Sequence, residues 1–138
     1  MATFVTQSVG KSLLDAIMGA GSYVGPSSVK VALFTVAPTE VAGTGTELTG
    51  GGYARALLSS SAAVNGSSGR TAQRTSSAAL LFTNMPVAST AVVGIALCSG
   101  DDDSVLMVND SWTPGATFAV GDNYTIPSAL LTGFFAKA

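Results

Sequence analysis

The side chains of this sequence that could do chemistry are few, and histidine is absent from all 138 residues. Without an imidazole, the chain has no Ser-His-Asp or Cys-His arrangement and no His-containing zinc or haem site. Cys98 is the single cysteine, in the apolar run 92–98, where we expect a small buried hydrophobic residue rather than a reactive thiol. We therefore expect no catalytic residue, no metal ligand and no cofactor.

Asp101-Asp102-Asp103 is the one cluster of charge in the sequence. Adjacent carboxylates can contribute oxygen ligands to a calcium site. The EF-hand pattern, however, needs acidic residues at alternate positions with a glycine and a distal glutamate, and none of these follows here. We interpret the triplet as a solvated hairpin turn. Its charges could also act as a negative handle at an interface or discourage edge-to-edge pairing of strands.

The segment 49–55 (TGGGYAR) superficially resembles a glycine loop that binds phosphate. It lacks the Gly-Lys-Ser/Thr ending of such loops, and no helix is expected to follow it. Consecutive glycines are better explained by backbone with positive φ, or by close approach to a neighbouring chain. For Arg55, at the end of the segment, we expect a structural ion pair with Glu47 or Glu40, and second to that a contact with a neighbouring subunit.

Arg70 and Arg74 lie four residues apart in a segment rich in Ser, Thr and Ala. They could form a phosphate clip, but an intersubunit salt bridge suits the rest of the sequence better. The six basic residues are scattered from Lys11 to Lys137 and form no stripe. We therefore expect no nucleic acid among the partners.

The composition favours assembly with other protein. Only 10% of the residues are charged, 47% are hydrophobic and the net charge is −2, whereas about 25% of an ordinary soluble domain is charged. Little electrostatic repulsion would keep copies apart. The charge-free stretch between Arg74 and Asp101 is interrupted by Asn84 and Pro86, so we expect no membrane span. The first 25 residues lack the pattern of a signal peptide, which predicts synthesis in a cytosol.

The elements that position these residues begin with a short amphipathic helix. Ser8 is expected to cap its start, and Gly19 with Gly21 to end it. Gly10 weakens its first turn by about 1 kcal/mol relative to alanine, so the helix is expected to dock on something. The apolar positions recur at spacings of three and four residues: Val9, Leu13, Leu14, Ile17 and Met18.

After Gly25-Pro26 the hydrophobic period changes to two, which is typical of strands. Part of 59–77 is expected to be a long exposed loop. Seven or eight short strands at this spacing predict a single-domain, all-β antiparallel sandwich over 26–138, preceded by an arm and the helix in 1–25. The expected strands are 29–36, 53–61, 79–82, 91–98, 105–108, 117–120, 124–126 and 130–135, with turns at 99–101 and 121–122.

The strings VKVALFT (29–35), APT (37–39), TELT (46–49) and GGGYAR (50–55) resemble a family of small virion proteins of tailed bacteriophages. The likeness extends to 13–15, 93–95 and 121–122, and 59–74 is the least similar part. Members are variously labelled tail-fibre or minor tail proteins, and comparable folds serve as capsid decoration, or cement, proteins. The resemblance implies a non-enzymatic virion component made in the cytoplasm of the bacterial host.

From the sequence we expect a capsid decoration protein that binds the major capsid protein and other virion proteins. It would act as a homo-oligomer, a trimer first of all, by making contacts that exist only in the assembled shell. A tail or tail-fibre-associated subunit is the alternative. A carbohydrate-binding module is a more distant one, although core packing better explains the aromatic residues Trp112, Tyr23, Tyr53 and Tyr124. The candidate interface residues are Thr3, Phe4, Val5, Arg55, Arg70 and Arg74.

Overall fold

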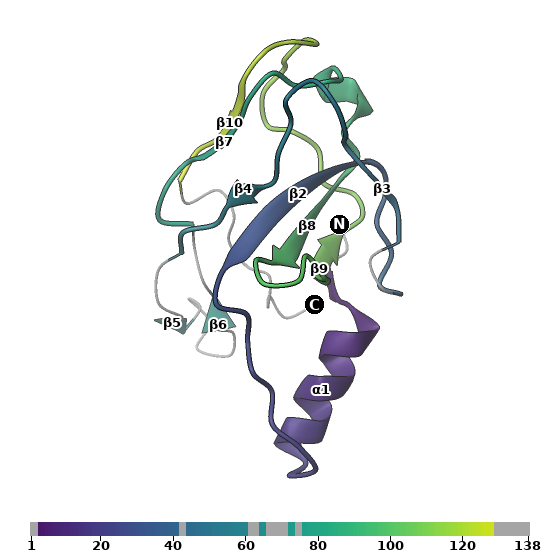
Figure 1. The fold of residues 1–138 in the computed structure, drawn as a ribbon, viewed down its shortest axis with the longest axis vertical. Coiled ribbons are helices and arrows are strands. Elements are labelled where there is room, and N and C mark those ends of the chain that lie inside the picture. Colours follow the sequence, from purple (N-terminus) through teal and green to yellow (C-terminus); the bar gives the residue numbers. More distant parts are fainter. Residues whose placement is uncertain (1–2, 42–43, 61–63, 66–71, 74–75, 129–138) are drawn as a thin grey trace.

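A computed structural model of the chain describes residues 3–41, 44–60, 64–65, 72–73 and 76–128. In these residues the fold is all-β apart from one α-helix and one 3-10 turn (Figure 1). The helical elements are α1 (Gln7–Ile17) and η1 (Ser89–Ala91). The strands are β1 (Thr3–Val5), β2 (Val29–Val36), β3 (Thr46–Glu47), β4 (Ala56–Leu57), β5 (Val64–Asn65), β6 (Ala72–Gln73), β7 (Leu80–Phe82), β8 (Gly94–Ser99), β9 (Val105–Asn109) and β10 (Tyr124–Ile126).

The centre of the fold is a six-stranded antiparallel sheet in the order β1-β9-β8-β2-β3, with β4 also paired to β2. β2 and β8 run antiparallel from the pair Val29 and Ser99 to the pair Phe34 and Gly94. Every residue of β8 is buried, which agrees with its mostly apolar sequence, in which Ile95 and Leu97 lie on one face and Ala96 and Cys98 on the other. Strands in both regions were predicted from their apolar sequences, over 29–36 and 91–98.

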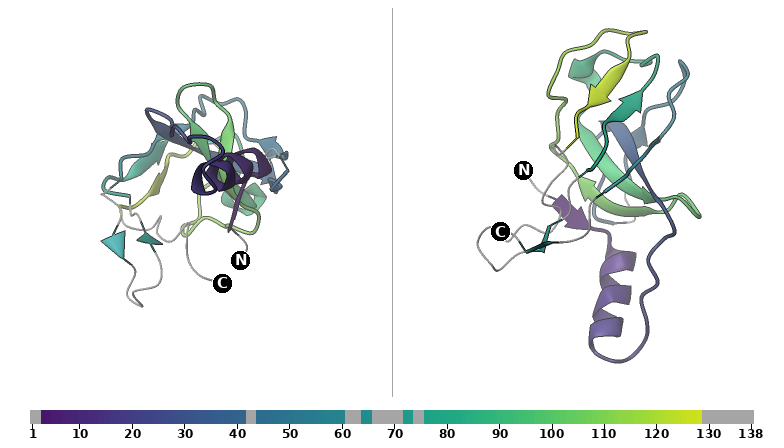
Figure 2. Two further views of the ribbon diagram at one scale, coloured as in Figure 1. Left: turned by 90° about the horizontal axis from the view of Figure 1, so that it is seen from below. Right: turned by 90° about the vertical axis from the view of Figure 1, so that its left-hand side faces the viewer.

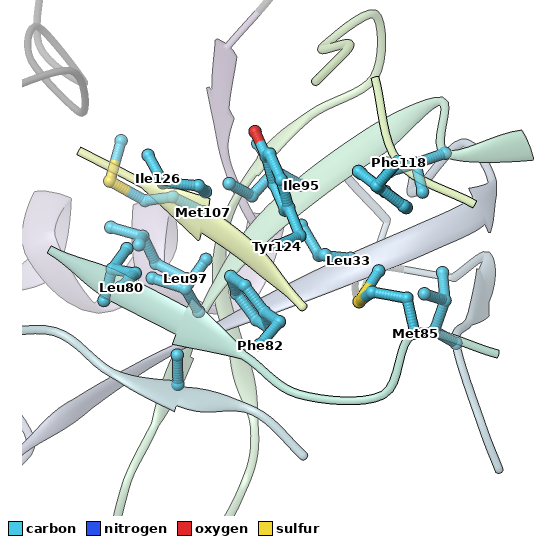
Figure 3. Packing of buried hydrophobic residues seen from close by; sticks show 14 residues of the cluster. Leu33, Leu80, Phe82, Met85, Ile95, Leu97, Met107, Phe118, Tyr124 and Ile126 are labelled. Atoms are coloured by element: carbon cyan, nitrogen blue, oxygen red, sulfur yellow. The ribbon is translucent and has the colours of Figure 1, made fainter. Parts of the chain in front are cut away.

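The ribbon formed by β7 and β10 makes the second layer. Leu80 and Phe82 of β7 are buried, and Leu81 between them is 54% exposed, which is the alternation of a strand covered on one face. Figure 3 shows these side chains meeting those of the large sheet. The main core consists mostly of Val31, Leu33, Ile95, Leu97, Leu80, Phe82, Met85, Tyr124 and Ile126. This arrangement confirms the expected sandwich with a short N-terminal helix.

The opposite face of the large sheet carries a smaller buried cluster. Because successive residues of a strand point to opposite faces, Ala32 and Phe34 lie on the side away from the main core. Cys98 is fully buried in this cluster, as expected from the sequence. Burial raises the pKa of the Cys98 thiol to about 11, so the sulfur stays protonated and unreactive in the folded protein.

Several strands differ from their sequence expectation. The strand expected over 53–61 is reduced to β4 and an isolated bridge between Ser60 and Ser76. It does not begin at Tyr53, because the glycines of 50–52 all have positive φ and Tyr53 N–H closes their turn onto the Gly50 carbonyl at 2.9 Å. A Cβ on Gly51 would lie 2.8 Å from the Asn84 carbonyl oxygen, so the glycine also serves close packing. The strand expected over 91–98 begins only at Gly94, after η1.

The prediction of a strand over 117–120 is wrong. Phe118 is buried, as a strand residue would be, but its carbonyl accepts a bond from Ser89 N–H at 3.0 Å, and Ala119 N–H donates to the Asp122 carboxylate at 2.9 Å. The segment is therefore held by side chains and loops rather than by a ladder. The strand expected over 130–135 lies outside the described residues.

Four strands have two or three residues each and were not anticipated: β1, β3, β5 and β6. β5 and β6 pair with each other inside the segment that was expected to be partly an exposed loop. A strand this short shows no measurable period of two, and only pairing with a distant segment defines it. Among the described helices, none has the length and apolar character needed to cross a membrane.

Candidate interaction surface

The root of α1 is anchored to the large sheet by Thr6. This residue is fully buried, and its hydroxyl lies 3.0 Å from the Val105 carbonyl and 3.2 Å from the Leu106 carbonyl of β9. Its own N–H donates to Leu106 at 3.0 Å. The expected cap at Ser8 is therefore wrong: the helix begins at Gln7, and Thr6 at the cap position uses its hydroxyl on β9 instead of on the helix.

Beyond Thr6, α1 extends away from the sheet (Figure 1), and the right-hand view of Figure 2 shows the same projection from another side. None of its residues is buried. Leu14 is 59% exposed, Ile17 80% and Met18, just past the helix, 75%. The helix ends at Ile17, and Gly19, two residues later, has the expected positive φ of +76°, while Gly21 has no positive φ. The docking expected for this helix is not made within the described residues.

The chain returns to the body through the linker 18–28, which is fixed at its far end to the β8–β9 turn. Ser27 N–H donates to the Asp101 carboxylate at 2.8 Å, and the Ser27 hydroxyl bonds to the same carboxylate. Gly100 N–H donates to the Ser28 carbonyl at 2.8 Å. The bonds from the Ser27 hydroxyl and amide hold the pKa of Asp101 below its usual range. We call residues 7–28, α1 and this linker together, the arm.

An open hollow of about 350 Å³ lies between α1, the linker and the β8–β9 turn. Ser8, Val9 and Ser12 of α1 line it on one side, and Asp101 and Asp102 on the other. Both carboxylates already accept bonds from serines of this chain. No group of three or more potential metal ligands occurs among the residues that the structure describes. We therefore interpret the hollow as the space between the body and the side of α1 that faces it, and not as a site for an ion.

The acidic triplet forms the exposed turn that was expected between β8 and β9. Asp102 accepts bonds from the N–H of Ser104 at 3.1 Å and from its hydroxyl at 2.7 Å, which closes the turn and lowers the pKa of Asp102. Asp103 lies 3.2 Å from Arg55 and 3.4 Å from Lys30. Each carboxylate thus has a partner within the chain, and the proposed role of the turn as a handle stays a prediction.

Arg55 forms the expected structural ion pair, and the partner is Glu47 rather than Glu40. Its Nε and Nη2 donate to the two carboxylate oxygens of Glu47 at 2.9 and 2.7 Å, and Nη1 donates to the carbonyl of Asp103 at 3.0 Å. The bonds to Glu47 raise the pKa of Arg55. The guanidinium therefore joins β3, the start of β4 and the β8–β9 turn.

Three of the four aromatic residues considered for sugar binding pack into the body. The Tyr53 ring stacks on Phe82 with centroids 6.0 Å apart, and its hydroxyl accepts a bond from Leu33 N–H at 2.9 Å. Burial raises the pKa of Tyr53. The Trp112 ring packs against the Tyr124 ring with centroids 6.5 Å apart. Core packing, the interpretation preferred from the sequence, is confirmed for these residues, and Tyr23 in the linker is the exception.

The six candidate interface residues do not form one surface among the described residues. Thr3, Phe4 and Val5 make up β1 and pair with β9 at one edge of the large sheet. Arg55 lies beside β4, on the other side of β2 in the strand order. Arg70 and Arg74 are outside the described residues. The role of all six as contacts stays a prediction.

The exposed apolar residues Leu14, Ile17 and Met18 were read from the sequence only as a helix face that must dock. The apolar stripe could be recognised in the sequence. Whether it faces the body or solvent could not, because periodicity does not say which side of a helix meets the body. The structure leaves these side chains exposed. They form the strongest candidate for an interaction surface.

The described residues thus define a β-sandwich with one projecting amphipathic helix, whose apolar residues Leu14 and Ile17 are exposed. The sequence matches the family described as Podophage GP4 fiber I protein gp80 over residues 5–133. Because this match spans nearly all of the chain, the protein belongs to that family and is a structural protein of a phage virion. The match includes 29–35 and 50–55 but does not show that these strings define the family. No curated protein matches the sequence.

Proposed function

We propose that the protein is a subunit of the virion's fibre, where it holds protein subunits together and uses the arm as its contact surface. The description of its family as a fibre protein favours this role over capsid decoration, which was the first expectation from the sequence. That description also names a structural protein rather than an enzyme. The observation that carries the proposal is the exposed apolar side of α1, with Ile17 80% exposed.

A partner on this surface has a clear physical benefit. Isolated helices shorter than about 12 to 15 residues are marginal in water, and α1 has 11 residues. Fully burying one Leu, Ile or Met side chain contributes about 1.5 to 3 kcal/mol. Burial of Leu14, Ile17 and Met18 by another subunit would therefore both stabilise the helix and supply binding energy.

Copy number separates the fibre role from capsid decoration. Quantitative mass spectrometry of purified particles, with the major capsid protein as the internal standard, should give a small number of copies in multiples of three, as tail positions allow. Hundreds of copies per particle would overturn the fibre role and restore the decoration of the shell.

Replacement of Ile17 tests the arm as the contact. In a phage that lacks its own copy of the gene, the Ile17→Lys protein should be lost from purified particles, as measured by immunoblot. The matched control is Val120→Lys, which replaces an apolar residue of the body that is 67% exposed. Equal incorporation of the two variants would contradict the use of the arm.

A further inference from the structure

The far end of the arm is apolar on both of its branches. Val24, Ile17 and Met18 are 85%, 80% and 75% exposed, the three highest values among the large hydrophobic side chains that the structure describes. Ile17 and Met18 end the helical branch, and Val24 lies in the returning linker (Figure 1). Val24 also lines the hollow on the body side of α1. We call residues 17–24 the tip, and its apolar surface is not confined to one stripe of the helix.

The tip is ready to be buried. The sequence has no charged residue between Asp15 and Lys30, so burial of the tip removes no ion from water. The turn also satisfies carbonyls at the end of α1. Ala20 N–H donates to the Asp15 carbonyl at 2.8 Å, and Gly19 N–H donates to the Ala16 carbonyl at 3.3 Å. An apolar cavity could therefore enclose the tip without leaving these groups unpaired.

The base of the arm, in contrast, is acidic. Asp101 and Asp102 of the β8–β9 turn accept bonds from serines, and none of the ion pairs among the described residues includes either of them. The same bonds hold the pKa of both carboxylates below the usual range, so both are charged at neutral pH. Lys11 of α1 does not balance them, because it pairs with Asp15 at 2.6 Å.

We propose that the tip inserts into an apolar socket on a different protein of the virion, and that basic side chains line the rim of this socket. The proposal deepens the proposed function, on which it rests for the use of the arm, by naming the chemistry of the partner. A concave partner covers both branches of the tip, whereas a flat one covers a single branch. Basic groups on the rim complement the acidic base of the arm.

The length of the arm sets the depth of the socket. An α-helix of 11 residues is about 16 Å long. The rim therefore meets the β8–β9 turn only when most of α1 lies inside, which also covers Leu14. This mode corresponds to an amphipathic helix held in a hydrophobic groove, with the arm as the inserted element.

Charge argues against two other occupants of this surface. A second copy of the arm would bring the same two carboxylates, Asp101 and Asp102, so like charges would meet. Amphipathic helices that lie on anionic membranes carry Lys and Arg on their polar face. The tip has no basic residue, and the turn at its base is acidic. A basic-rimmed protein socket suits both features.

Photocrosslinking in purified particles tests the socket. Benzoylphenylalanine replaces Ile17 or Val24 in the full chain, supplied to a phage that lacks its own copy of the gene, and mass spectrometry identifies the products after irradiation. Both positions should crosslink to the same virion protein, and that protein should not be this chain. The matched control is benzoylphenylalanine at Val120, an exposed apolar residue of the body, which should not give this product.

Crosslinks from Ile17 and Val24 to different proteins, or to a second copy of the chain, would overturn the socket. Sedimentation of the purified chain with vesicles of anionic phospholipid would also overturn it, in favour of a lipid surface. If any of these results is found while Ile17→Lys is still lost from particles, the arm remains the contact surface. The proposed function would then stand and the socket would not.

Removal of the acidic charge tests the basic rim. The double variant Asp101→Asn, Asp102→Asn keeps side-chain oxygens that accept bonds from the serines but removes both charges. Its affinity for the purified partner that the crosslink identifies, measured by interferometry, should fall about three- to tenfold and lose most of its dependence on NaCl. The matched control is Asp110→Asn, just past the opposite end of β9, which should bind like the wild type. Equal affinities of the double variant and this control would refute the basic rim.

Discussion

The body and the arm are stabilised in different ways. In the body, β8 is buried along its whole length, and two layers of apolar side chains close a core around Phe82. In the arm, no residue of α1 is buried, and the segment is held mainly by bonds at its two ends, at Thr6 and at Ser27. The buried core of the body therefore supplies the free energy that stabilises the folded chain. The arm takes its position from the body and has apolar surface left for a partner.

Truncation of a core residue should produce the largest difference between the two regions. Phe82 is 1% exposed and stacks between Tyr53 and Tyr124, so Phe82→Ala should lower the free energy of unfolding by about 3 to 5 kcal/mol. Ile17→Ala, in the arm, should change it by less than about 0.5 kcal/mol in the isolated chain. Urea unfolding followed by tyrosine and tryptophan fluorescence gives both values at low protein concentration. A similar loss for the two variants would contradict the comparison.

The anchor at Thr6 should give an intermediate effect. Thr6→Val keeps the shape of the side chain but removes the hydroxyl that bonds to β9, which should cost about 1 to 2 kcal/mol. The helical signal in circular dichroism should fall, because the root of α1 loses its attachment. Thr125→Val on the exposed face of β10 is the control and should change neither quantity. Retention of the full helical signal in Thr6→Val would show that α1 does not depend on this anchor.

Acid should break the second attachment of the arm, the bonds between Ser27 and Asp101. We expect this to be the smallest of the effects. The pKa of Asp101 is lowered by its bonds to Ser27, so the folded state favours the charged carboxylate. The contribution of these bonds is present above the usual pKa of an aspartate and is lost as the pH falls through the lowered value. Hydrogen exchange at the Ser27 amide should therefore accelerate, relative to the intrinsic rate, only in acid. Asp101→Asn should remove this pH dependence, and an unchanged profile would rule out the carboxylate as the cause.

Much of the body could be predicted because its signals are local. The strands around Val31, Ile95 and Met107 are long enough for apolar and β-branched residues to define them, and the glycine triplet indicated its own turn. From the sequence, the ion-pair partner of Arg55 was predicted to be Glu47 or Glu40. In the structure the partner is Glu47, because β3 and β4 both pair with β2. Phe118 shows the reverse case, since its apolar segment looked like a strand but is held by the Asp122 side chain.

Periodicity and composition, which are properties of neighbouring residues, were enough to predict a sandwich of short strands, an amphipathic helix near the start and little charge. The side of the helix that faces outward could be read only from the folded chain. That choice depends on Thr6 meeting a strand 99 residues away in sequence and on Ser27 meeting a turn 74 residues away. Contacts at such separations exist only once the sheet has formed, and no local pattern in the chain encodes them.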